Sequence, residues 1–199
     1  MRARELRDLV ISALVLALAF GIAFSGGFRA FSSPQVILLM SLMALVGVSS
    51  GFIIHELGHR FVARRLGCLA EYTMWPAGLA VALAFSLFGF IFAAPGAVMI
   101  YPRADASGVA ALSREKSGLI SITGPALNMG LAVVFILLDV FYPTLLFSLG
   151  AWINSWLALF NLIPFGPFDG AKVFAWSVAT WLAAVVVAVA LLAVQYLVL

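Results

Sequence analysis

The sequence predicts an all-α polytopic membrane protein that contains a small membrane-embedded re-entrant or β-like segment. Of its 199 residues, 65% are hydrophobic and 10% are charged, whereas soluble domains are about 45–50% apolar and about 25% charged. Uncharged runs long enough to cross a bilayer, which takes about 20 residues each, recur along the chain. We therefore expect about five transmembrane helices, with six possible, in a single intramembrane domain of residues 1–199 without a soluble regulatory domain.

The first two predicted helices lie at the N-terminus. Arg2, Arg4 and Arg7 precede an uncharged run over residues 9–28, which resembles a secretory signal but lacks a convincing small-residue cleavage site. We therefore expect an uncleaved first span. A second uncharged run over residues 34–54 continues without a helix breaker into a polar stretch. This pattern predicts one long helix whose last third is polar.

Residues 72–102 are uncharged but do not resemble a simple helix. Pro76 and Pro95 interrupt the segment, and residues 97–101 are typical of a short strand. We expect the segment to enter the membrane and return to the side from which it came. A polar loop follows over residues 105–116.

The C-terminal half contains three further predicted spans. Residues 117–138 and about 144–163 are two of them, and residues 164–170 then break the helix with prolines and glycines. Residues 173–199 are uncharged, and they are long enough for one tilted span but too short for two.

Basic residues predict the orientation of these spans, because Lys and Arg concentrate in cytoplasmic loops. An N-terminus inside the cell returns the end of the second helix to the cytoplasm. Arg103, Arg114, Lys116 and Lys172 then also lie inside, but only if residues 72–102 return rather than cross. The positive-inside rule therefore favours the re-entrant interpretation.

The chemistry of the chain centres on the pattern His55-Glu56-Leu57-Gly58-His59. Histidines four residues apart project from one helical face and can share a metal, most often zinc. The glutamate beside the first histidine is then close enough to deprotonate a zinc-activated water as the general base. Both histidines of the chain lie in this motif, inside an apolar helix, where ionisable groups are costly and usually functional.

A catalytic zinc site typically has three protein ligands, so two histidines leave it one ligand short. By the predicted topology, Asp139 falls on the outer side of the membrane, whereas Asp169 follows the two spans that return the chain to the cytoplasmic side. Glu71 also lies on the cytoplasmic side, but at or beyond the end of the motif helix. We expect Asp169 to be the third ligand, with Glu71 as the open alternative.

Three motifs in order resemble the site-2 protease family of intramembrane zinc metalloproteases: the H-E-L-G-H pattern, Gly124-Pro-Ala-Leu-Asn128, and Asn161 followed by Pro-rich residues up to Phe-Asp169-Gly. The resemblance implies that His55, His59 and Asp169 bind one Zn²⁺ per chain and that Glu56 is the catalytic base. It also implies that Asn128 and Asn161 bind the substrate. The usual Leu-Asp-Gly appears here as Phe-Asp-Gly, a change of pocket shape that leaves the ligand chemistry intact.

We therefore expect an intramembrane endopeptidase in the cell membrane, with its active site toward the cytoplasm and a transmembrane protein as its substrate. A metal-binding transporter or channel is the alternative from another class, and it would not need Glu56. The net charge of +3 is small and scattered, so we expect the lipid bilayer as a partner and no nucleic acid. Asn128 and Asn154 are each also compatible with simple hydrogen bonding between packed helices.

Overall fold

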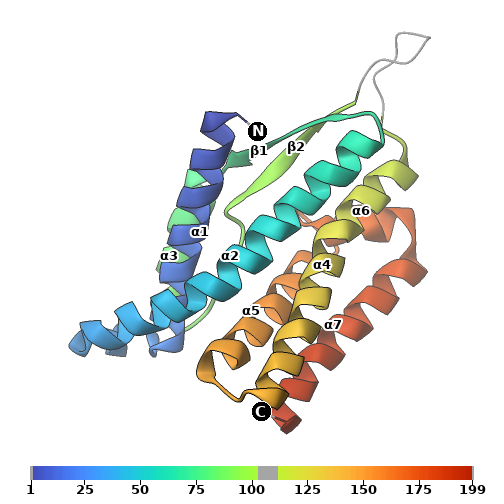
Figure 1. Cartoon of the computed structure of the whole chain (residues 1–199). Coiled ribbons are helices and arrows are strands. Elements are labelled where there is room, and N and C mark those ends of the chain that lie inside the picture. The colour runs from blue at the N-terminus through green and yellow to red at the C-terminus, as the bar shows by residue number, and fades with distance from the viewer. Residues whose placement is uncertain (1, 103–111, 199) are drawn as a thin grey trace.

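The computed structural model describes residues 2–102 and 112–198. Within these residues the chain forms α-helices, one short 3₁₀ helix and a two-stranded sheet. Figure 1 shows the helices side by side in a bundle, with the sheet near the N-terminus of α1. Among the described residues, four helices are long and apolar enough to cross a membrane: α1, α2, α4 and α7. The shorter apolar helix α5 has 17 residues, so the count of five spans stays a prediction.

Helices α1 (Ala3–Phe24) and α2 (Pro34–Arg65) pack against each other and are joined by the 3₁₀ helix η1 (Gly27–Ser32). Helix α1 begins six residues before the predicted run at residue 9 and includes the charged Glu5. Its carboxylate is buried and lies 3.1 Å from the guanidinium Nε of Arg60 in α2. Helix α2 continues unbroken through the histidine motif, as the sequence predicts.

The segment after α2 forms strand β1 (Leu69–Met74), helix α3 (Pro76–Ser86) and strand β2 (Gly96–Tyr101). The strands are antiparallel, with Leu69 opposite Tyr101, so the segment returns to the place where it started. The strand expected at residues 97–101 is confirmed. Sequence reasoning missed β1 and α3, although β-favouring Tyr and Thr occur in the first and a proline begins the second.

A buried tyrosine attaches this hairpin to α1. The hydroxyl of Tyr72 donates to Ser12 Oγ at 2.9 Å, and the backbone N–H of Tyr72 donates to Glu5 Oε1 at 3.2 Å. A tyrosine hydroxyl carries its proton at neutral pH and can therefore donate. These contacts fix the sheet against the bundle.

Helices α4 (Arg114–Phe141) and α5 (Leu145–Asn161) form a tightly connected antiparallel pair. Asp139 stabilises the turn between them, because its carboxylate accepts from the Thr144 N–H at 2.9 Å and from the Ser148 hydroxyl at 2.7 Å. Most of the polar loop predicted at residues 105–116 lies outside the described residues. The predicted C-terminal end of this loop is wrong, since α4 already begins at Arg114.

The final predicted span is confirmed as one candidate membrane helix, but this helix begins at Val178 and not at the start of the uncharged run at residue 173. The chain forms α6 (Asp169–Trp176) and then α7 (Val178–Val198), with an extended backbone at Ser177 between them. Ser177 Oγ accepts from the N–H of Thr180 at 3.2 Å, so the serine caps the first turn of α7. Sequence reasoning missed this cap because the surrounding run is uniformly apolar.

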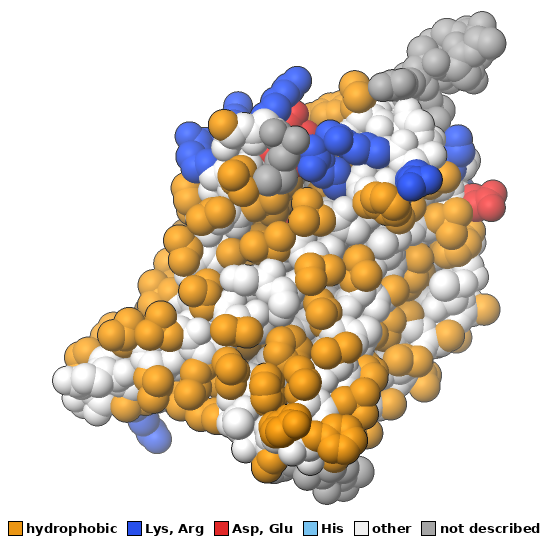
Figure 2. Space-filling model, viewed as in Figure 1, with side chains coloured by type: hydrophobic (Ala, Val, Ile, Leu, Met, Phe, Trp, Pro, Cys, Tyr) orange, Lys and Arg blue, Asp and Glu red, His pale blue; other side chains and the backbone are white. Residues whose placement is uncertain are grey.

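Charged side chains gather at one end of the molecule. Figure 2 shows Lys and Arg concentrated over the end where α1 begins and α2 finishes, above sides covered with hydrophobic residues. Ion pairs join elements at this end, with Arg2 3.1 Å from Glu71. The start of α1 and the end of α2 therefore lie at the same end of the molecule, as the predicted topology requires.

Candidate metal centre and active site

Helix α2 presents two imidazoles on one buried face. His55 and His59 are one helical turn apart and 4–5% exposed, and their Nε2 atoms are 2.9 Å apart. Asp169, the first residue of α6, brings its Oδ2 to 2.9 Å from His59 Nε2 and 3.3 Å from His55 Nε2. These three residues are the group of potential metal ligands found in the described part of the chain.

The loop between α5 and α6 brings Asp169 to the histidines by a close backbone approach. A Cβ atom on Gly170 would collide with the carbonyl group of Leu162 at the end of α5. Gly166 adopts a positive φ of 66° in the same turn, a conformation that glycine adopts without steric cost. Both residues of the Asp-Gly pair therefore matter: the aspartate is the potential ligand, and the glycine is small enough for the close backbone approach.

The ligand atoms fit a zinc ion in their spacing. Ligand atoms of a tetrahedral zinc with bonds of about 2.0–2.1 Å lie roughly 3.3 Å apart, and the three distances here are 2.9, 2.9 and 3.3 Å. His59 Nδ1 lies 2.7 Å from the backbone carbonyl oxygen of Ile120. A carbonyl can only accept, so this nitrogen carries the proton and Nε2 has a free lone pair.

The neighbouring helix α4 packs closely against the two imidazoles. Gly124 faces them, and a Cβ atom on it would collide with His59 Nε2 and lie 2.5 Å from His55 Nε2. The converging lone pairs suit a bound cation, and carboxylate with imidazole is a donor set typical of zinc. The residues present therefore fit the metal that the motif predicts.

Glu56 lies beside this ligand set in a small cavity of about 50 Å³, which Asp169 and Lys172 also line. A water molecule needs roughly 10–15 Å³ of such space, so the cavity can hold water. Glu56 is 7% exposed, and its Oε2 has no hydrogen-bond partner among the described residues. A buried carboxylate oxygen without a partner is available for proton transfer.

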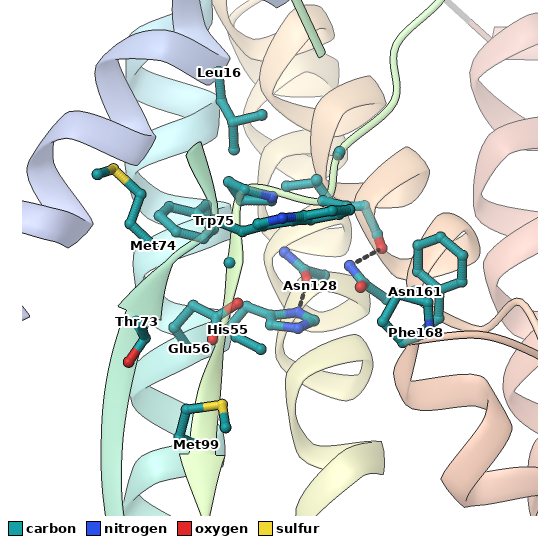
Figure 3. Close-up of a pocket in the computed structure, with 18 residues that line it drawn as sticks. Leu16, His55, Glu56, Thr73, Met74, Trp75, Met99, Asn128, Asn161 and Phe168 are labelled. Carbon is teal, nitrogen blue, oxygen red and sulfur yellow. Dashed lines mark hydrogen bonds between the residues drawn. The ribbon is translucent and has the colours of Figure 1, made fainter. Parts of the chain in front are cut away.

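A larger cavity of about 330 Å³ adjoins the small one along His55 and Glu56. Figure 3 shows the side chains around it, with Met74 and Trp75 on the side of the sheet and Phe168 on the opposite side. Most of its remaining lining is apolar, including Leu16, Phe52 and Leu157. His55 and Glu56 therefore border a mainly apolar space inside the helix bundle.

The two asparagines predicted to bind substrate occupy different positions. Asn161 lines both cavities, and its amide donates to the Leu157 carbonyl at 2.9 Å. Asn128 is fully buried, and its Oδ1 lies 2.6 Å from His55 Nδ1 (Figure 3). The substrate role of each stays a prediction, and the contacts of Asn128 favour a role in holding His55.

The contacts of the other acidic residues show which of them are available as a third metal ligand. Asp139 is engaged at the turn between α4 and α5, and Glu71 pairs with Arg2, so both are committed elsewhere. Sequence reasoning used Lys172 only for orientation, but its Nζ is 3.8 Å from Asp169 Oδ1. The spacing of three residues between Asp169 and Lys172 gives this contact because α6 begins at Asp169, a helix start that the sequence analysis did not predict.

Comparisons with known proteins agree with this geometry. The sequence profile of Peptidase family M50 matches residues 43–145. A protein of Methanocaldococcus jannaschii named "Putative zinc metalloprotease" is 42% identical over 184 residues, which cover 89% of this chain and 87% of the relative. No solved protein structure shows a significant match.

A second relative is longer than this chain. "Putative zinc metalloprotease Rip3" of Mycobacterium tuberculosis is 31% identical over 146 residues, which cover 69% of this chain and 28% of the relative. The match with Rip3 therefore concerns about a quarter of that protein. Together with the profile match and the longer alignment to the archaeal relative, it shows that the chain belongs to Peptidase family M50, the site-2 protease family of zinc metalloproteases.

Proposed function

We propose that the chain is an intramembrane endopeptidase that hydrolyses a peptide bond in or near a transmembrane segment of a membrane-protein substrate. In this proposal His55, His59 and Asp169 hold one zinc ion and Glu56 is the general base. The observation that carries the proposal is a buried carboxylate oxygen, Glu56 Oε2, that has no hydrogen-bond partner among the described residues and lies beside three converging ligand atoms, inside a bundle of apolar helices.

The bound zinc ion would polarise the scissile carbonyl and lower the pKa of a water molecule to about 7. Glu56 would take a proton from that water through its free Oε2 and later deliver it to the leaving amine. Asn161 would contact the substrate from the shared wall of the two cavities. The apolar lining of the larger cavity suits the side chains of a transmembrane segment.

Strand β2 supports a specific way to hold such a substrate. A transmembrane helix must unwind locally before its backbone can be attacked, and each unpaired backbone group costs several kcal/mol in hydrocarbon. Within the described residues, β2 pairs with β1 along one edge, and its Gly96, Ala97 and Val98 line the small cavity beside Glu56. We propose that the unwound substrate pairs with the other edge by strand addition.

The helix ends support a cytoplasmic active site. His59 is six residues from the end of α2, which places it roughly 9 Å from the basic end at 1.5 Å per residue. Lys172, which is half exposed, lines the small cavity at this end and marks a route for water. By the positive-inside rule this end faces the cytoplasm.

Three substitutions in the purified full chain test the proposal. Glu56→Gln should leave zinc bound and reduce cleavage of a model transmembrane peptide by at least about 100-fold, because general acid–base catalysis contributes about 10²–10⁴-fold. Asp169→Ala should lower zinc content and cleavage together, since it removes a ligand. The matched control Asp139→Ala, at the other end of α4, should keep zinc and cleavage.

Zinc content and peptide cleavage are measured on the same samples. Cleavage at the wild-type rate by Glu56→Gln would refute the role of this residue as base and would leave the transporter alternative open. Full, tightly held zinc in Asp169→Ala would show that the third ligand lies elsewhere.

A further inference from the structure

Asn154 is a fully buried residue of α5 whose amide has a fixed direction. Its Nδ2 donates to the Gly150 carbonyl at 2.9 Å and points to the Gly47 carbonyl at 3.4 Å. Both partners are backbone carbonyls, which only accept hydrogen bonds. The amide of Asn154 therefore turns its NH₂ group toward these carbonyls and its Oδ1 away from them.

The fixed direction of Asn154 is passed to Asn128. Asn154 Oδ1 accepts from Asn128 Nδ2 at 3.1 Å, so Asn128 must turn its own Oδ1 the other way. That oxygen lies 2.6 Å from His55 Nδ1, as Figure 3 shows for the two side chains. His55 Nδ1 therefore donates the hydrogen bond, and the lone pair of a neutral His55 remains on Nε2.

The alternative direction of Asn128 would disable His55 as a ligand. If the Asn128 amide turned over, its NH₂ group would face His55 Nδ1, which would then have to accept. The ring proton of a neutral His55 would move to Nε2, the atom that lies 3.3 Å from Asp169 Oδ2. A protonated Nε2 cannot bind a metal ion, because metal binding needs that lone pair.

Helix α2 leaves room for this pair of asparagines. Gly51 lies one turn before His55, and a Cβ atom on it would be 2.6 Å from Asn154 Oδ1 and 3.2 Å from Asn128 Nδ2. The hydrogen bond between the two asparagines therefore depends on a glycine at this position of α2. The close approach of α2 and α5 therefore accommodates the hydrogen-bonded asparagine pair as well as apolar packing.

We propose that Asn154 is a positioning residue of the metal site, which fixes the hydrogen-bond direction of Asn128 and thereby keeps His55 Nε2 free to bind zinc. This inference rests on the proposal that His55 is a zinc ligand. The inference gives α5 a role in metal binding, although none of the proposed zinc ligands belongs to this helix. A role in helix packing alone would affect stability and not the affinity for zinc.

The test measures zinc affinity and stability separately. The zinc dissociation constant of the purified full chain is obtained by competition with a chelator of known affinity, and the Tm of the metal-free protein reports stability. Asn154→Leu, which has similar size but no hydrogen-bonding groups, should weaken zinc binding by about 10–100-fold, the usual effect of losing a group that orients a metal ligand. Asn154→Asp, with its buried carboxyl protonated, keeps a donor for the Gly150 carbonyl and an acceptor for Asn128 Nδ2, and should stay within about threefold of wild type, well short of that loss.

A matched control and a reference variant complete the comparison. Ser155 is also buried in α5 and accepts from Gln195 Nε2 at 2.8 Å, away from the metal site. Ser155→Ala should lower the Tm and leave zinc affinity unchanged. His55→Ala should weaken zinc binding more than any of these variants, and unchanged affinity there would refute the ligand assignment itself.

A double-mutant cycle separates positioning from packing. If Asn154 acts through Asn128, then Asn154→Leu should cause no further loss of zinc affinity in an Asn128→Leu background. Gly51→Ala provides a second route if Asn154→Leu does not fold, since its methyl group displaces Asn154 Oδ1 and should also weaken zinc binding. Any of three results would overturn the proposal. They are wild-type zinc affinity in Asn154→Leu or in Gly51→Ala, equal losses of affinity for the Leu and Asp variants of Asn154, and additive losses in the cycle.

Discussion

Replacing Gly124 with alanine should abolish tight zinc binding without touching any ligand. A Cβ atom at this position would lie 2.5 Å from His55 Nε2 and collide with His59 Nε2, whereas real Cβ contacts below 3.0 Å essentially never occur. The two rings must therefore retreat from α4 by about half an ångström or more, while zinc–ligand distances tolerate about ±0.2 Å. The methyl group would also occupy space beside the ligand atoms.

The expected loss of zinc affinity from Gly124→Ala is at least 10–100-fold, the range caused by disturbing groups that orient metal ligands. This range corresponds to about 1.4–2.7 kcal/mol of binding free energy. Alanine is favoured over glycine inside a helix by about 0.8–1 kcal/mol, so the change does not weaken α4 through its helix propensity. A loss of zinc would therefore report the collision at the site.

Chelator competition on the purified chain measures the zinc affinity of Gly124→Ala. The matched control is Gly130→Ala in the same helix, where the added Cβ would meet nothing within 4 Å among the described residues beyond its chain neighbours and the nearby backbone of α4. This control should bind zinc like wild type and should be slightly more stable. Wild-type zinc affinity in Gly124→Ala would refute the inference that the close contact of Gly124 with His55 and His59 keeps these rings in position to bind zinc.

Two further predictions concern the substrate and the membrane. A model transmembrane peptide with N-methyl groups on alternate residues around the scissile bond should be cleaved at least about tenfold more slowly, because it cannot donate backbone hydrogen bonds to the edge of β2. The same groups placed far from that bond should have little effect on the cleavage rate. Equal rates for all peptides would refute strand addition. In a Cys68→Ser background, a single cysteine at Ser113 should resist an impermeant thiol reagent applied to intact right-side-out membranes, whereas one at Tyr142, 68% exposed between α4 and α5, should react. The opposite result would reverse the assigned orientation.

Local sequence was sufficient to predict the histidine motif and most of the helices. The four-residue spacing of His55 and His59 places both rings on one helical face by the period of the helix alone. The apolar runs that gave α2 and α4 predict helices because a backbone in hydrocarbon must satisfy its hydrogen bonds within the segment. The break at Ser177 was missed, since a serine cap inside an apolar run is a weak signal.

The third ligand was predicted by counting crossings, and the structure brings Asp169 to the histidines as that count requires. The count depended on residues 72–102 returning to the same side, and the pairing of Leu69 with Tyr101 brings the two ends of this segment together. Strand β1 was missed because a two-stranded sheet is defined by its partner strand, and a short sequence shows only a modest β-preference.

The sequence by itself determined a multi-pass membrane protein with a zinc motif, and it predicted a general base and a third ligand, because helical period, hydrophobicity and charge distribution act locally. Only the tertiary structure showed the contacts of Gly124, Asn128 and Asn154, which join separate helices; Asn154 and Gly47, for example, are 107 residues apart. The direction of a hydrogen bond depends on which group each side chain faces. That direction sets whether His55 offers a lone pair or a proton, and it exists only after α2, α4 and α5 have packed together.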